Sequence, residues 1–97
     1  MRKMRSFLVM LVLFSFLFSG CYYFSAKNEI KNAEKLFAEL KAEGGANLVP
    51  YEYCSAEKFL EVSKIEFKDN DFKPAKELAS RSKSAAEAGL AEIKKKK

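Results

Sequence analysis

A short apolar run near the N-terminus is the strongest constraint on this chain. Phe7 to Phe18 is apolar apart from Ser15, and the cationic residues Arg2, Lys3 and Arg5 precede it. A bilayer core takes roughly 20 apolar helical residues to cross, so this run is too short to span one comfortably. A positive segment followed by a short apolar stretch is typical of a secretory signal. The sequence therefore predicts a signal peptide over residues 1–20.

The residues that end the run indicate lipid attachment. The small residues Ser19 and Gly20 precede Cys21, whose thiol can carry a thioether-linked diacylglycerol. This stretch closely resembles the lipobox of bacterial lipoproteins, with Phe18 where that pattern prefers Leu. The resemblance implies cleavage between Gly20 and Cys21 and two or three acyl chains on Cys21, enough for stable anchoring because each buried CH₂ contributes about 0.8 kcal/mol.

The same residues predict the location. Tyr22, in place of an Asp after the cysteine, resembles lipoproteins sorted to the periplasmic face of the outer membrane. The outer face of the inner membrane and a Gram-positive cell membrane are the alternatives. An uncleaved anchor helix that continues from the apolar run through Phe24 is the other interpretation of this segment.

Charge and composition bear on the function class. The formal net charge of +5 comes from the two ends, because residues 22–93 hold eleven basic and thirteen acidic residues. A nucleic-acid-binding face needs its basic charge within the folded part, so we expect no nucleic-acid partner. The chain has no His, the usual general base and commonest metal ligand. We therefore expect no catalysis, no cofactor and no metal site.

The rest of the chain is predicted to be all-α. Apolar residues at three- and four-residue steps indicate helices at about 26–43, 50–68 and 72–93. The breaks are Gly44-Gly45 and the turn-forming Asp69-Asn70-Asp71, with Pro50 in a first turn and Ser25 and Asp71 as N-caps. Small residues on the third helix let a neighbour approach closely: Ala75, Ala79, Ser82 and Ala86. We expect a small antiparallel three-helix bundle over 26–93, after a lipidated tether at 21–25 and before a basic tail at 94–97.

The second and third helices resemble a family of small Ala-rich lipoprotein domains of unknown function, sometimes found ahead of OmpA-like domains. Nine positions match its pattern: Pro50, Tyr53, Ala56, Leu60, Asp71, Phe72, Ala75, Leu78 and Ala79. Val49, Ser63 and Asn70 depart from it, the last where the family has Gly. The resemblance implies a tetratricopeptide-like helical hairpin on a lipid anchor, and it supplies no active-site residues.

A few residues allow more than one interpretation. Cys54 is either a small, partly buried helix residue or a thiol for an intermolecular disulfide. Tyr51 and Tyr53 could stack on cell-wall sugars, although we expect Tyr53 to pack in the bundle and Tyr22 and Tyr23 to lie near the membrane interface. The carboxylates of Glu66, Asp69 and Asp71 lack the ligand number of a cation site.

The C-terminal lysines also have alternatives. Lys94 to Lys97 suit a helix C-terminus and then extend into solvent, or they attract an anionic envelope surface. Lys97 alone resembles the terminal Lys of the murein lipoprotein, which is joined to peptidoglycan.

Taken together, these features predict a lipid-anchored cell-envelope protein with a structural or protein-interaction role and an envelope protein as its partner. The alternative is a membrane-anchored accessory subunit that binds a small ligand or a peptidoglycan fragment. An apolar groove between the second and third helices would favour that alternative.

Overall fold

The fold is all-α, as the periodicity predicts. The computed structural model describes the backbone of residues 2–96 and the side chains of residues 4–13 and 22–96. The helices are α1 (Arg2–Ala42), the single turn α2 (Gly45–Leu48), α3 (Pro50–Lys68) and α4 (Phe72–Lys96), and the described residues contain no strand.

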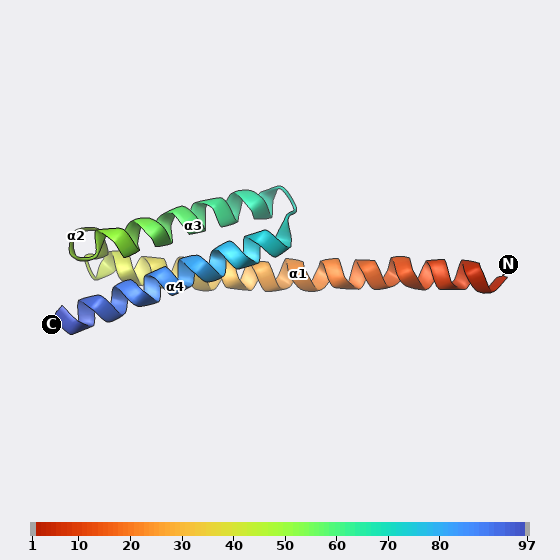
Figure 1. The fold of residues 1–97 in the computed structure, drawn as a ribbon, viewed down its shortest axis with the longest axis horizontal. Helices are drawn as coiled ribbons and strands as arrows, with labels where there is room; N and C mark the ends of the chain where they lie inside the picture. Colours follow the sequence, from red (N-terminus) through yellow and green to blue (C-terminus); the bar gives the residue numbers. More distant parts are fainter. Residues whose placement is uncertain (1, 97) are drawn as a thin grey trace.

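The helices form a body with one long projection. α3 and α4 run antiparallel to each other, and both pack against the C-terminal half of α1 (Figure 1). The N-terminal half of α1 extends alone beyond the body, which makes the molecule about 70 × 21 × 15 Å. The α3–α4 turn lies beside the middle of α1, whereas α2 and the C-terminus lie together at the far end of the body.

The core follows the predicted apolar faces. Buried positions recur at alternating three- and four-residue steps on each helix: Ala26, Ile30, Ala33 and Leu40 on α1, Ala56, Leu60 and Ser63 on α3, and Ala75, Ala79, Ser82, Ala86, Gly89 and Ile93 on α4. This spacing keeps one narrow face of each helix toward its neighbours. The small residues predicted on the last helix are all buried, so they allow α3 and α4 to approach closely.

Two serine hydroxyls in this core join α3 to α4. Ser63 Oγ donates to the carbonyl of Ala75 at 2.6 Å, and Ser82 Oγ donates to the carbonyl of Ala56 at 2.7 Å. Both serines are fully buried, and each hydroxyl needs a partner because an unpaired buried polar group costs about 1–3 kcal/mol. The two bonds run in opposite directions across the helix pair.

Left-handed residues end two helices. Gly44 follows α1 with φ +80°. After α3, Asn70 adopts φ +66°, its N–H donates to the carbonyl of Phe67, and the N–H of Asp71 donates to the carbonyl of Glu66. This is the Schellman pattern, in which Asn can take the place of the usual Gly. Asn70 therefore occupies the left-handed position that Gly usually takes at a helix end.

Three boundaries differ from the sequence-based expectation. α1 is continuous from Arg2, so Ser25 lies inside a helix and its prediction as an N-cap was wrong. Residues 21–25, predicted as a lipidated tether, belong to this helix. No Pro occurs before residue 50, and Gly20, the one Gly within α1, costs a helix only about 1 kcal/mol. The helical stretches before and after Gly20 therefore join into one helix. α4 continues to Lys96 instead of ending at residue 93. The connector at 45–48 forms the extra turn α2.

The chain packs tightly around Leu40. This side chain is fully buried, and a Cβ added at Gly89 would lie 2.9 Å from Leu40 Cδ1 and 3.2 Å from Glu52 Cβ. A Cβ added at Gly45 would lie 2.6 Å from Leu40 Cγ and 2.8 Å from the Leu40 carbonyl oxygen. Leu40 therefore fills space that two glycines leave open.

We expect Gly89→Ala to lower the melting temperature of the full chain in mild detergent, followed by circular dichroism. Overpacking costs about 1–3 kcal/mol, which outweighs the gain of about 0.5–1 kcal/mol in helix propensity. In a Leu40→Val background the crowded δ-methyl groups are absent and only the contact with Glu52 Cβ stays tight, so the same substitution should cost less stability.

The exposed neighbour Ala88 provides the control for propensity alone. Ala88→Gly should destabilise the helix by about 0.5–1 kcal/mol in both backgrounds. If Gly89→Ala lowered the melting temperature equally in the wild-type and the Leu40→Val backgrounds, the packing explanation would be contradicted.

Candidate functional site

The projecting half of α1 exposes apolar side chains around its whole circumference. Every large apolar residue from Met4 to Leu13 is between 50% and 73% exposed. Isolated apolar residues are common on protein surfaces, but an uninterrupted apolar stretch of this length marks a site that another phase or protein covers. The predicted signal segment is thus the part of the described chain least suited to water.

The predicted lipidation and cleavage residues lie where this projection meets the body. The backbone at Gly20 and Cys21 belongs to α1, and their side chains are outside the described part of the structure. Among the residues described, no helix contains a segment long and apolar enough to cross a membrane.

An aromatic cluster lies directly after Cys21. The ring of Tyr23 is 5.3 Å from the rings of both Phe67 and Phe72, centroid to centroid, and these two are 5.3 Å from each other. Such spacings favour edge-to-face contacts, and two of the three pairs have them. Tyr23 therefore packs against the α3–α4 turn, which the sequence did not predict, and Phe24 beside it is 66% exposed.

The other tyrosines divide as expected. Tyr53 packs in the core with its ring 5.0 Å from Phe37, which confirms the prediction. Tyr51, at the opposite side of α3, is 79% exposed. Cys54 is exposed and unbonded in the structure, so the partly buried alternative was wrong.

The acidic turn after α3 has an electrostatic cost. Partial burial raises the pKa of the Glu66 carboxyl, and a hydrogen bond with the Asp71 carboxyl and the charges of Asp71 and Asp69 raise it further. Crowded carboxylates favour the protonated form because like charges repel. No group of ligands able to hold a metal ion occurs among the described residues.

Ion pairs hold α1 to the other helices. Lys83 Nζ on α4 lies 3.2 Å from Glu29 Oε1, and Lys64 Nζ on α3 lies 2.9 Å from Glu34 Oε1. Lys83 contacts Glu29 although Glu87 lies four residues on, at the spacing of a pair within one helix. The Lys64–Glu34 pair is exposed and contributes little, about 0–1 kcal/mol, whereas the Lys83–Glu29 pair is partly buried.

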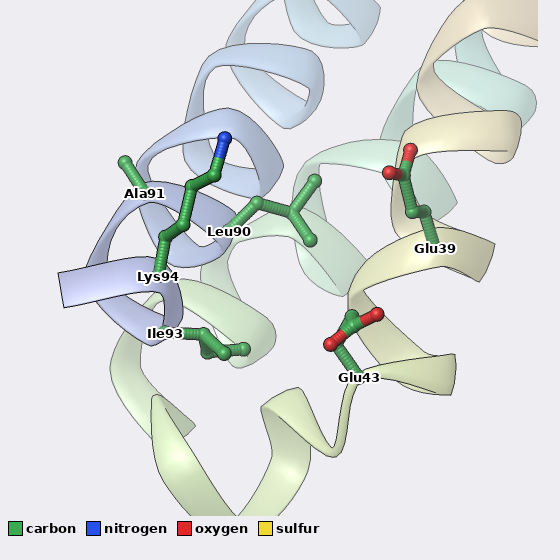
Figure 2. Close-up of a pocket in the computed structure, with 6 residues that line it drawn as sticks. All are labelled: Glu39, Glu43, Leu90, Ala91, Ile93 and Lys94. Carbon is green, nitrogen blue, oxygen red and sulfur yellow. The ribbon is translucent and has the colours of Figure 1, made fainter. Parts of the chain in front are cut away.

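A cleft opens at the far end of the body. It has a volume of about 540 Å³ and lies between α1 and α4, not between α3 and α4, where buried Ala and Ser fill the interface. Figure 2 shows its residues, with two carboxylates, one on α1 and one just after its end, facing an apolar and basic wall from α4: Glu39, Glu43, Leu90, Ala91, Ile93 and Lys94.

The basic tail is partly ordered beside this cleft. Lys96 Nζ donates to the carbonyl of Leu48 at 2.9 Å, which ties the end of α4 to the end of α2. The Lys96 side chain stays exposed, and its ammonium bonds to a carbonyl at a helix end, where a cation is favoured. Lys97, the residue similar to the murein lipoprotein terminus, lies outside the described residues.

No protein-family model, curated protein or solved structure matches the chain. Function is therefore inferred from the residues and their arrangement.

The crowded carboxylates predict a pH effect on stability. The raised pKa means that the folded state holds the Glu66 proton more tightly than the unfolded state. Stability from this proton is present below the ordinary carboxyl pKa and is lost as pH rises through the raised value. We expect Glu66→Gln to raise the melting temperature at neutral pH and to lose that advantage at about pH 4, where the wild-type carboxyl is largely protonated.

Glu61→Gln, on the exposed face of the same helix, controls for the loss of one charge from α3. A Glu66→Gln variant that is less stable than wild type at neutral pH would show that the carboxylate is favourable in the fold.

Proposed function

We propose that this chain is a lipid-anchored cell-envelope protein, held at a membrane through acyl chains on Cys21. One observation carries the proposal: a helix whose apolar side chains from Met4 to Leu13 are exposed on all sides continues without a break through Ser19-Gly20-Cys21. Such a segment is stable in a lipid phase and unfavourable in water, at roughly 25 cal/mol for each Å² exposed. The lipobox resemblance implies that this segment is cleaved after Gly20 and that acyl chains on Cys21 then hold the protein at the membrane.

The role proposed for the folded part is structural or protein-interacting, with an envelope protein as partner. Its contacts support this function class, because the described buried residues are apolar apart from two serines whose hydroxyls are hydrogen-bonded. The interactions of the described ionisable groups include ion pairs, a helix-end contact and a crowded acidic turn. We also propose that α3, α4 and the second half of α1 constitute an antiparallel three-helix bundle with a tetratricopeptide-like hairpin.

Metabolic labelling with palmitate in a bacterial host tests the anchor. The wild-type chain should incorporate label, Cys21→Ala should incorporate none, and the matched variant Cys54→Ala should label as wild type does. Globomycin, which blocks the lipoprotein signal peptidase, should convert the mature form into a slower-migrating precursor. Equal labelling of both variants, or no label in the wild type, would contradict lipidation at Cys21.

The uncleaved anchor makes a different prediction in the same experiment. It gives a membrane-bound chain with no label and no mobility change on globomycin treatment.

The cleft between α1 and α4 favours a second candidate, a subunit that binds a small ligand or peptidoglycan fragment. Its volume of about 540 Å³ lies in the usual range for small-molecule sites. Peptidoglycan stem peptides carry both amines and carboxylates, which match the acidic and basic walls. Leu90 and Ile93 provide an apolar surface for the uncharged part of such a peptide.

Binding of a soluble muropeptide, followed by amide chemical shifts of the labelled protein, tests this candidate. Ala91→Arg should fill the cleft and abolish the shifts, because Ala91 is exposed and lines it. Ala88→Arg, exposed on α4 but outside the cleft, should leave them unchanged. Shifts that persist in the Ala91→Arg variant would place the ligand elsewhere.

A further inference from the structure

The folded body begins immediately after the proposed lipid site. Tyr22 continues α1 without a break, Tyr23 packs against Phe67 and Phe72, and Ala26 is fully buried. A flexible tether would let the body turn freely relative to its anchor. Here the residue next to Cys21 is part of a rigid helix, so the position of Cys21 fixes which end of the body meets the membrane.

That end of the body is rich in aromatic side chains. The cluster of Tyr23, Phe67 and Phe72 forms its centre, and Phe24 stands beside it with 66% of its side chain exposed. Tyr22 is also exposed. Aromatic side chains are favoured at the boundary between lipid and water, since they have a large apolar area and polar or quadrupolar edges.

We propose that this aromatic end, composed of Tyr22, Tyr23, Phe24, Phe67 and Phe72, rests on the lipid interface and holds the body upright. The inference rests on the membrane attachment proposed at Cys21. It goes further in assigning a lipid-contacting surface and an orientation. An uncleaved anchor would place the same end at the membrane, because the apolar half of α1 leaves the body there.

The orientation sets the height of the opposite end. The helix from Cys21 to Ala42 rises about 1.5 Å per residue, so α2, the cleft and the end of α4 stand about 30 Å from the lipid site. The Debye length is about 8 Å at physiological ionic strength, so Lys94 to Lys96 do not interact with the headgroups of this membrane. The cleft and these lysines therefore point away from the membrane that holds Cys21.

The contact is aromatic more than electrostatic. The charged residues around the aromatic end are equal in number: Lys27, Lys68 and Lys73 against Glu66, Asp69 and Asp71. Equal charges give little net attraction to anionic lipid, so we expect the same orientation on zwitterionic and anionic bilayers.

Lipid-depth measurements on the full lipidated chain test the orientation. In a Cys54→Ser background, a fluorophore is attached at Lys73→Cys or at Lys95→Cys, both exposed positions on α4. The protein is reconstituted in phosphatidylcholine vesicles containing brominated lipid, with and without phosphatidylglycerol, and the lipid on Cys21 is verified by intact mass. We expect at least about fivefold stronger quenching at position 73 than at position 95, because the two differ in height by about 33 Å.

A second pair of variants tests the aromatic contact. Phe24→Ser should reduce quenching of the position 73 label by about twofold or more, because an exposed aromatic is lost from the interface. Tyr51→Ser removes a more exposed aromatic from the far side and should change nothing.

The outcomes separate the two claims. Equal quenching at positions 73 and 95 in a lipidated, vesicle-bound protein overturns the orientation and leaves the anchor intact. A reduction of equal size in both serine variants overturns the assignment of the aromatic surface. Absence of both lipid and vesicle binding overturns the proposed function, and the orientation with it.

Discussion

Close approach of backbones through small side chains is the condition on which this fold depends. Among the described side chains, Leu40 is the one large group that is completely buried, and it fits because Gly45 and Gly89 leave it room. Ile30, Leu60 and Ile93 are nearly buried, and the other core positions on the helix faces are mostly alanines, with two serines. Each of these small side chains buries little apolar area, so stabilisation depends on many short dispersion contacts that are lost when the helices separate slightly. The close approach of the helices thus explains both why the core buries little apolar area and why larger side chains do not fit at these positions.

Much of the body could be predicted from local sequence, because local interactions determine it. Pro50 in a first turn and Asp69-Asn70-Asp71 as a break locate α3 at the predicted residues 50–68. An unbroken helix through Phe24 was expected only for an uncleaved anchor, whereas the favoured prediction began a new helix at residue 26. Ser25 does not break a helix, and each residue added to an existing helix gains one backbone hydrogen bond, so the helix continues through this position.

Contacts between helices were harder to predict, since they depend on rotation and register that no single helix determines. Lys83 has a partner four residues on, yet Glu29 on another helix is the one it contacts. Phe67 and Phe72 flank a turn, so their proximity was foreseeable, but the addition of Tyr23 was not. The cleft depends on where α1 and α4 end relative to each other. The lipidation proposed at Cys21, in contrast, depends on a run of adjacent residues, so the sequence alone is enough to propose it.

The two serine bonds across α3 and α4 have a consequence for uniqueness. Alanine faces are smooth, so helices that meet through them can slide by a turn at small cost in packing. Ser63 and Ser82 each require one particular carbonyl on the opposite helix, and a slide would leave both hydroxyls buried and unbonded. Because the bonds have opposite directions, rotation about the axis of either helix breaks them as well. The two hydroxyls thus favour one register of α3 and α4 among several that apolar packing alone would allow.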